Sequence, residues 1–347
     1  MITLRNLKYQ ISNEGDHEMA NWYFDKDADL AWVEGKTIGI FGYGNQGRSQ
    51  ALNMRDAGLN VIVGSRSDDS ARKSRDDGFE TLPLAEAAEK ADVLFILVPD
   101  EVMPQIYEES LAPGLSAGNT LVFASGYNIH FKYIQPRADV NVIMIAPRMV
   151  GQGVRDTVVA GTGFPSLVAV HQDADGSAAK TMLGLSRAIG STRMGVIESS
   201  FEEETIVDLF HEQFGSLHAI RRALEVLTEA GCSPEAAMLE MYASGEVREI
   251  GQYYVDHGLF GQLKLHSRTS EYGQLVYARG KPEQEEAHKN QLRAIVERIR
   301  DGSFAREWTE VQANGMTAMK EAQEEIENHP MMVEERKLYE RLGRFSS

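Results

Sequence analysis

The chain has 347 residues, enough for two domains, and 42% of them are hydrophobic, which is normal for a globular protein. Its formal net charge of −17 argues against nucleic acid and against anionic membrane surfaces as partners, because both bind basic faces. A single cysteine, Cys232, excludes an internal disulfide and a thiolate metal cluster, and it favours a cytoplasmic protein.

Residues 1–21 are predicted to be an extension that leads into the fold. They contain no apolar segment typical of a secretory signal. No run of 18 apolar residues occurs in the chain, so no membrane span is expected.

From Lys36 onward, short apolar runs alternate with helical patterns. The runs are TIGIFGYG, NVIVGS, DVLFILVP, TLVFASG and NVIMIAP, and the helical patterns include GNQGRSQALNMRDAG and PLAEAAEKA. A further unit starts at SLVAVHQ and ends near residue 190. This alternation predicts a Rossmann-type, doubly wound parallel sheet over residues 22–190, with helices on both faces.

Residues 191–347 are predicted to form an all-α domain, which opens with the segment SSFEEETIVDLFHEQFG. Ser200 followed by Glu203 is a capping-box signature, and the helix dipole accounts for Glu202, Glu203 and Glu204 in the first turn. Asp208 and Glu212 lie beyond that turn. Their spacing places them on one face, roughly 6 Å apart at Cβ, where like charges repel.

A glycine-rich turn follows the first predicted strand and opens a helix. Gly42 permits a tight turn, Gly44 lets the backbone approach a pyrophosphate, and Gly47 allows the helix to pack closely on the strand. In this position the pattern is strong evidence for a dinucleotide site. The predicted cofactor contacts are Gly42, Tyr43, Gly44, Asn45, Gln46, Gly47, Ser65, Arg66, Ser70 and Pro99.

The loop after the second strand leaves the choice between NADPH and NADH open. Ser65, Arg66, Ser67 and Ser70 suit the 2′-phosphate of NADPH, whereas Asp68 and Asp69 oppose it.

The segment WYFDKDADLAWVEGKTIGIFGYGNQGRSQALNMRDAG resembles the start of the ketol-acid reductoisomerases. The resemblance continues through LVPDEVMPQIYEE, SGYNIHF, GVIESSFEEETIVDLFHEQ, SEYG and IRDGSFAREW, and covers residues 22 to 342. It implies an enzyme that uses NADPH or NADH with Mg²⁺ to convert a 2-hydroxy-2-alkyl-3-keto acid into a 2,3-dihydroxy acid. It also implies a homodimer with interleaved helical domains.

The resemblance assigns roles to the acidic residues. Asp208 and Glu212 match the family's magnesium ligands, and Glu240 matches the first of two further glutamates from the partner subunit. The second glutamate should fall on Ser244, unless a two-residue insertion brings Glu246 into line with a bulge at Gly245. Ser267 matches the substrate-binding serine.

Two departures change the expected chemistry. Ser125 stands where the family has histidine, and Arg148 stands where it has lysine, within APRMVGQ instead of APKGPGH. Arginine does not exchange protons near neutral pH. We therefore expect Asp208, Glu212, Arg148 and Ser125 to act in catalysis, with reduction of a keto substrate retained and little activity on acetolactate. The alternatives are a genuine ketol-acid reductoisomerase and a keto or imine reductase of specialised metabolism.

Overall fold

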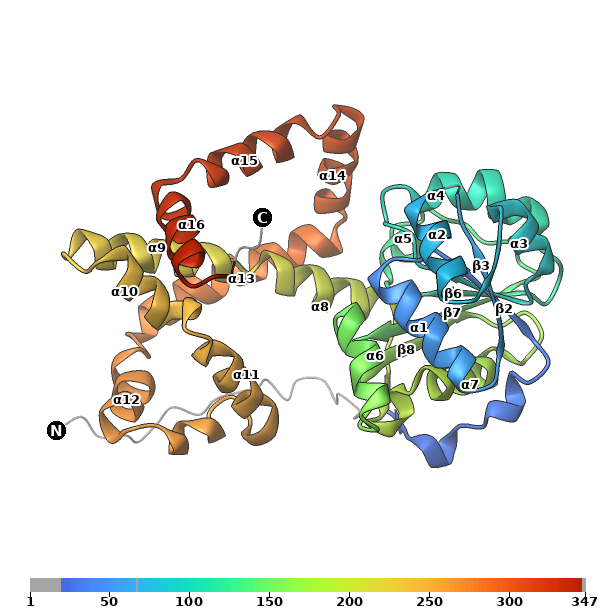
Figure 1. Ribbon diagram of the computed structural model, residues 1–347, viewed down its shortest axis with the longest axis horizontal. Coiled ribbons are helices and arrows are strands. Elements are labelled where there is room, and N and C mark those ends of the chain that lie inside the picture. The colour runs from blue at the N-terminus through green and yellow to red at the C-terminus, as the bar shows by residue number, and fades with distance from the viewer. Residues whose placement is uncertain (1–19, 67, 345–347) are drawn as a thin grey trace. The chain divides into compact units, whose positions relative to one another are not determined.

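The computed structural model describes residues 20–66 and 68–344, so Ser67 and almost all of the predicted extension lie outside the described residues. The chain divides into two compact units, the first ending at Thr205 and the second starting at Ile206 (Figure 1). Within the described ranges, no helix combines the length and apolarity needed to cross a membrane.

The first unit is built on a nine-stranded sheet with the order β1-β9-β8-β7-β6-β5-β2-β3-β4. The Rossmann-type fold predicted from the alternating pattern is confirmed. Its strands are β1 Trp22–Tyr23, β2 Thr37–Phe41, β3 Asn60–Gly64, β4 Glu80–Leu82, β5 Val93–Ile96, β6 Thr120–Phe123, β7 Asn141–Pro147, β8 Ser166–Gln172 and β9 Val196–Glu198.

The central strands are continuous apolar runs because both of their faces are buried. Ile38 and Ile40 of β2 point into one hydrophobic core, and Phe41 points into the other. Helices α1, α6 and α7 cover the first face, while α3 and α4 cover the second. The helices of this unit are α1 Asn45–Asp56, α2 Asp69–Asp76, α3 Leu84–Lys90, α4 Met103–Ile106, α5 Tyr127–His130, α6 Gly151–Val159 and α7 Ala178–Ile189.

The sheet is mainly parallel, as predicted, and includes two antiparallel pairs. The pairs from β4 through β7 are parallel, but β8 runs antiparallel to β7, and β1 runs antiparallel to β9. An apolar run has the same composition in either direction, so its pattern does not encode the direction of the strand.

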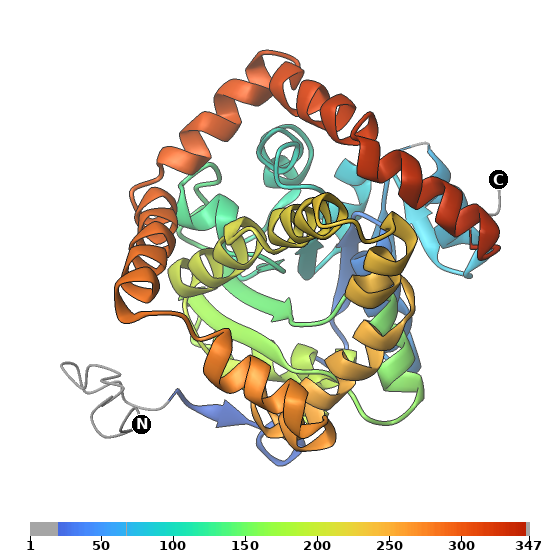
Figure 2. The same ribbon diagram turned by 90° about the vertical axis from the view of Figure 1, so that its left-hand side faces the viewer.

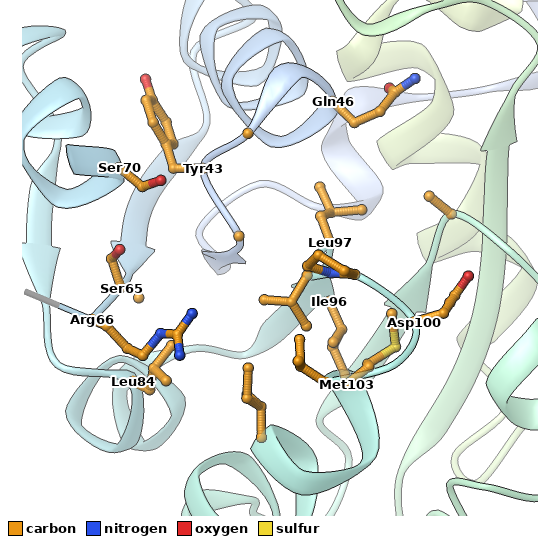
Figure 3. Close-up of a pocket in the computed structure, with 18 of the residues that line it drawn as sticks. Tyr43, Gln46, Ser65, Arg66, Ser70, Leu84, Ile96, Leu97, Asp100 and Met103 are labelled. Atoms are coloured by element: carbon orange, nitrogen blue, oxygen red, sulfur yellow. The ribbon is translucent and has the colours of Figure 1, made fainter. Parts of the chain in front are cut away.

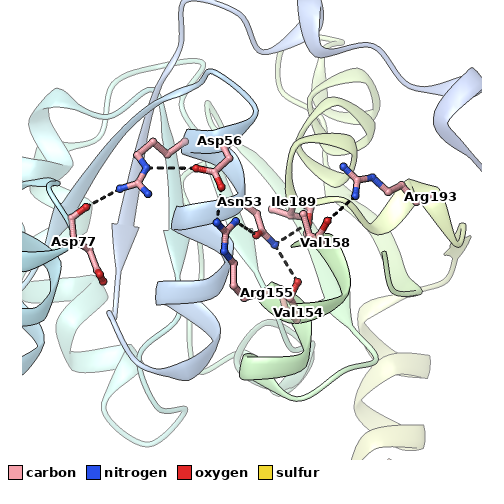
Figure 4. Close-up of polar contacts among 9 residues, drawn as sticks. Asn53, Asp56, Asp77, Val154, Arg155, Val158, Ile189 and Arg193 are labelled. Atoms are coloured by element: carbon pink, nitrogen blue, oxygen red, sulfur yellow. Dashed lines mark hydrogen bonds and ion pairs between the residues drawn. The ribbon is translucent and has the colours of Figure 1, made fainter. Parts of the chain in front are cut away.

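A polar network fastens α1 to α6 and α7 (Figure 4). The buried Asn53 side chain donates to the carbonyls of Val154 and Ile189, at 3.1 Å each. Arg155 donates to Asn53 Oδ1 at 2.7 Å and to Asp56 Oδ2 at 2.5 Å. Asn53 and Asp56 of the NMRD segment therefore have structural partners that hold α6, the helix that follows Arg148, against α1.

The second unit is entirely helical in its described part, as predicted. Its small core packs side chains of α9, α10 and α16, including Leu224, Met238 and Leu338. The chain from α13 to α16, coloured orange to red, runs through consecutive helices joined by short turns (Figure 2). The helices are α8 Phe201–Gln213, which begins in the first unit, α9 Ser216–Glu229, α10 Pro234–Met238, α11 Glu246–His257, α12 Arg268–Tyr272, α13 Pro282–Arg300, α14 Ser303–Ala313, α15 Thr317–Glu327 and α16 Pro330–Arg341.

Candidate functional site

Each of the three glycines in the turn between β2 and α1 meets a different geometric requirement. Gly42 has φ +106°, a backbone conformation that favours glycine. A Cβ on Gly47 would lie 1.8 Å from the carbonyl oxygen of Gly42, so only glycine lets the helix come this close. A Cβ on Gly44 would meet nothing within 4 Å. The backbone at Gly44 is therefore open to a ligand at the N-terminus of α1, where free N–H groups favour an anion.

A cavity of about 580 Å³ extends from this turn along the carboxyl ends of β2, β3 and β5 (Figure 3). It is lined by every predicted cofactor residue except Gly47, which lies behind the turn. Ser65, Arg66 and Ser70 are at one end of the lining, and Asp100 and Met103 are at the other (Figure 3). Ser125 also lines the cavity. A cleft at the carboxyl ends of parallel strands is where this fold binds dinucleotides.

At the adenosine end of the cavity, Asp68 forms hydrogen bonds within the protein. Asp68 Oδ1 accepts the backbone N–H of Ala71 at 3.1 Å, so it caps α2, and it also accepts the Ser65 hydroxyl at 3.3 Å. Arg66 is exposed beside it and lines the cavity. The loop therefore contains both a guanidinium that favours a 2′-phosphate and a carboxylate that disfavours it.

At the other end, a buried carboxylate connects the two departures from the family pattern. Glu204 is 1% exposed, and its oxygens accept the Gly126 N–H at 2.6 Å and the Arg148 guanidinium at 3.1 Å. A Cβ on Gly126 would lie 2.0 Å from the Phe201 carbonyl oxygen, so the turn after Ser125 packs directly on the start of α8. Glu204 thus fixes Arg148 and the backbone next to Ser125 to the same helix.

Glu204 is the site residue that sequence reasoning missed. The helix dipole was expected to account for Glu202, Glu203 and Glu204 together, but Glu204 is buried and paired with an arginine. The capping box is also only half formed, since Ser200 Oγ accepts Glu203 N–H at 3.0 Å while the Glu203 carboxylate accepts the Ser199 hydroxyl at 2.6 Å. The available signal was periodicity, because Glu204 follows Phe201 by three residues and belongs to the buried face of α8.

In the second unit, Asp208 and Glu212 lie one turn apart on α8, as their spacing predicted. Loss of hydration, and then the neighbouring Asp208 carboxylate, raise the pKa of Glu212 above its ordinary value. Two carboxylates that repel each other would be stabilised by a cation. Among the described residues of a single chain, no three His, Cys, Asp or Glu side chains form a metal-binding group.

The helix that carries Glu240 is interrupted where the sequence departs from the family. Residues Leu239–Ala243 form a π-helical turn, Gly245 has φ +99°, and α11 starts at Glu246. The structure therefore has a break where a bulge was predicted at Gly245. Arg344 donates to the carbonyls of Ala243 and Ser244, which the break leaves without helical partners. Glu240 and Glu246 are both exposed and lie on opposite sides of the break.

The remaining predicted residue, Ser267, is the N-cap of α12. Its hydroxyl accepts the backbone N–H of Ser270 at 3.2 Å, and the side chain is exposed. The hydroxyl proton is therefore available to a ligand.

Comparison with known proteins gives one family for residues in both units of the fold. Residues 32–195 match the profile for the acetohydroxy acid isomeroreductase NADPH-binding domain, and residues 201–343 match the ketol-acid reductoisomerase C-terminal domain. The chain is 46% identical over 316 residues to the ketol-acid reductoisomerase (NADP(+)) of Methanopyrus kandleri, covering 90% of this chain and 95% of that one. It is 44% identical over 296 residues to the enzyme of the same name from Methanocaldococcus jannaschii, covering 84% and 88%.

Solved structures give the same result. An NADH-preferring ketol-acid reductoisomerase from an uncultured archaeon superposes with a TM-score of 0.84 and 38% identity, covering 92% of this chain and 99% of that one. A pyrroline-5-carboxylate reductase from Coxiella burnetii, at 17% identity and a TM-score of 0.53, shares only the fold.

Proposed function

This chain belongs to the ketol-acid reductoisomerase family, and from that premise we propose that it converts a 2-hydroxy-2-alkyl-3-keto acid into a 2,3-dihydroxy acid. As a family member it is an NAD(P)H-dependent oxidoreductase. Two relatives that are at least 44% identical bear the name of the complete reaction, which favours isomerisation with reduction over the reduction-only interpretation of the sequence.

The observation that carries this proposal is the cavity that connects the glycine turn to Ser125. When bound there, a reduced nicotinamide supplies the hydride for the second half-reaction. The protein contributes a cradle at Gly44, a hydroxyl at Ser125, and a fixed positive charge at Arg148 that Glu204 orients. A guanidinium held in this way can bind a carboxylate or an enolate oxygen of the substrate without changing its own protonation state.

We assign Asp208 and Glu212 as Mg²⁺ ligands, with Glu240 and Glu246 of a partner subunit as further candidates and Ser267 as a substrate contact. Hard carboxylate oxygens one helical turn apart suit Mg²⁺, which keeps several waters and takes few protein ligands. Bound Mg²⁺ would polarise the substrate oxygens. Asp208→Asn should weaken Mg²⁺ binding in calorimetry, and unchanged binding would exclude the pair as ligands.

A homodimer is proposed from the apolar surface of the second unit. Large side chains between residues 247 and 277 are exposed in the single chain, with Phe260 at 67% and Tyr277 at 84%. Large exposed apolar side chains are stabilised by burial against a partner. A stable and fully active monomer in analytical ultracentrifugation would contradict this assignment.

A second candidate is reduction without isomerisation. It is favoured by Arg148 and Ser125, because neither relays protons near neutral pH as readily as lysine or histidine. The two functions separate in one assay with Mg²⁺ and either cofactor. Turnover of acetolactate supports the complete reaction. Turnover only of a 3-hydroxy-2-keto acid, which needs no alkyl migration, supports the second candidate. Turnover of neither compound would overturn both.

A further inference from the structure

One carboxylate outside the cavity connects the glycine turn and α1 to the end of α2. Asp77 follows the last residue of α2, and its Oδ2 accepts the Tyr43 hydroxyl at 2.8 Å and Arg48 Nε at 2.7 Å. Its other oxygen accepts Arg48 Nη2 at 2.9 Å. Tyr43 belongs to the glycine turn, and Arg48 belongs to the first turn of α1. Asp77 therefore ties the pyrophosphate cradle to the far end of α2.

The backbone of the same turn is held from α1 as well. Arg55 Nη1 donates to the carbonyl oxygen of Asp77 at 2.6 Å. The Arg55 guanidinium lies 5.0 Å from the centre of the Phe79 ring, and that ring meets Tyr43 edge-on at 5.8 Å. The main chain and the side chain of Asp77 are thus both fixed by residues on or next to α1.

Tyr43 does not offer its hydroxyl to the cavity. Its side chain is 3% exposed and its hydroxyl points away from the space that the lining residues enclose (Figure 3). Only its backbone belongs to the cradle. The sequence places Tyr43 among the cofactor contacts, and its backbone lines the cavity while the contacts of its side chain indicate an anchor.

The position of α2 gives this anchor a consequence for the cofactor. Helix α2 starts immediately after Asp68, at the adenosine end of the cavity, and ends at Asp76, directly before Asp77. A helix is stiff, so a contact that holds Asp77 against α1 also holds the first residue of α2 in place. We propose that Asp77 is a positioning residue that sets the separation between the pyrophosphate cradle and the adenosine loop. This inference rests on the proposed dinucleotide site.

The charges of the cluster support this arrangement. The hydrogen bond from Arg48 is the largest influence on Asp77 and lowers the pKa of its carboxyl, so Asp77 stays ionised. Burial and the bond to Asp77 raise the pKa of Tyr43, so its hydroxyl stays a donor. The ion pair is partly exposed, with 46% of the Arg48 side chain accessible, and such pairs add little to overall stability.

Steady-state kinetics and direct binding of NADPH test the proposal. For Asp77→Ala we expect KM and Kd for NADPH to rise about tenfold, while kcat at saturating cofactor stays within about twofold. Tyr43→Phe removes one of the three bonds and should raise the same constants about threefold. Asp76→Asn, an exposed carboxylate one residue away on α2, is the matched control and should leave both constants unchanged.

The probe for the adenosine half is adenosine 2′,5′-bisphosphate, which lacks the nicotinamide. Its affinity should fall in Asp77→Ala in parallel with that of NADPH. If Asp77→Ala lowers the melting temperature but leaves Kd unchanged, Asp77 only stabilises the fold, and the inference is overturned. If Asp77→Ala does not fold, Tyr43→Phe decides, and an unchanged Kd in that variant overturns it. Failure of the native protein to bind NADPH or NADH would instead refute the cofactor site itself.

Discussion

Glu204 holds Arg148 at 3.1 Å while its other oxygen holds the backbone of Gly126 at 2.6 Å. The position where the family has lysine and the turn that follows Ser125 are therefore connected through one buried carboxylate. Arginine can hold such a partner with a fixed charge and a planar group. The two substituted positions are consequently parts of one arrangement rather than isolated changes.

Glu204→Gln should reduce both turnover and stability. The amide keeps the shape and one acceptor but removes the charge that orients Arg148, which should lower the free energy of unfolding by roughly 1–3 kcal/mol. Urea unfolding and kcat measure the two effects. Glu203→Gln is the matched control, because its carboxylate is exposed and bonds only locally to Ser199. Equal behaviour of the two variants would remove Glu204 from the site.

Arg148→Lys should increase turnover of acetolactate and add a pH-dependent limb to its rate. Lysine keeps the charge next to Glu204 and can exchange a proton when its pKa is lowered by its surroundings. The measurement is kcat for acetolactate from pH 6 to pH 10. A rate that equals that of the native protein and stays independent of pH would show that a lysine at this position does not carry a proton.

Gly44 and Gly47 should respond differently to substitution. Gly44→Val places its side chain in open space toward the cofactor, so the protein should keep its melting temperature and lose NADPH binding. Gly47→Ala forces a Cβ against the Gly42 carbonyl oxygen and should cost more than about 2 kcal/mol of stability. Thermal melting and calorimetric titration separate the two effects. Loss of stability at Gly44 would contradict its role as an open cradle.

Arg66 should decide the preference between the two cofactors. Because Asp68 is engaged as the cap of α2, we expect the guanidinium to pair with a 2′-phosphate. Arg66→Gln should raise KM for NADPH about tenfold and leave KM for NADH within about twofold. Both values come from the same reductive assay. An equal loss for NADPH and NADH would show that Arg66 contacts a part that they share.

His130 should make stability depend on pH. Burial lowers its pKa below the ordinary value of 6.5, and the nearby Glu202 only partly opposes this shift. The unfolded chain therefore takes up this proton first, so stability is lost as pH falls below about 6.5 and toward the lowered folded value. His130→Gln should show a smaller loss than the native protein between pH 7.5 and pH 5.5 in urea unfolding. Identical slopes would exclude this histidine as the cause.

The central part of the fold could be predicted because its strands are long, apolar and bounded by turn residues. Strands β2, β3, β5, β6 and β7 all follow from such runs. The short strands β1, β4 and β9 did not appear in the prediction, since two or three residues such as Glu80–Leu82 carry no periodic signal. Pairing with a neighbouring strand, which is a tertiary effect, is what makes them strands.

The site was predictable only in part for a similar reason. The glycine turn is local, and each glycine is specified by backbone geometry within a few residues. Glu204 belongs to the site because it bonds to Gly126 and Arg148, which lie 78 and 56 residues away along the chain. From the sequence alone, the helix dipole was a sufficient explanation for a glutamate in the first turn of α8. Only the packing of α8 on the turn after Ser125 distinguishes this glutamate from Glu202 and Glu203.

The two edge strands of the sheet have a consequence for aggregation. The apolar runs of β5, β6 and β7 would pair readily with another chain if they were exposed. The strands that end the sheet are β1, with two residues, and β4, with three, and β4 carries Glu80 in an ion pair with Lys90 at 3.2 Å. The shortness of both edges and the charge on β4 leave little template for intermolecular pairing. Loss of protein during storage should therefore follow the rate of unfolding of the first unit, and ligands that slow this unfolding should preserve solubility.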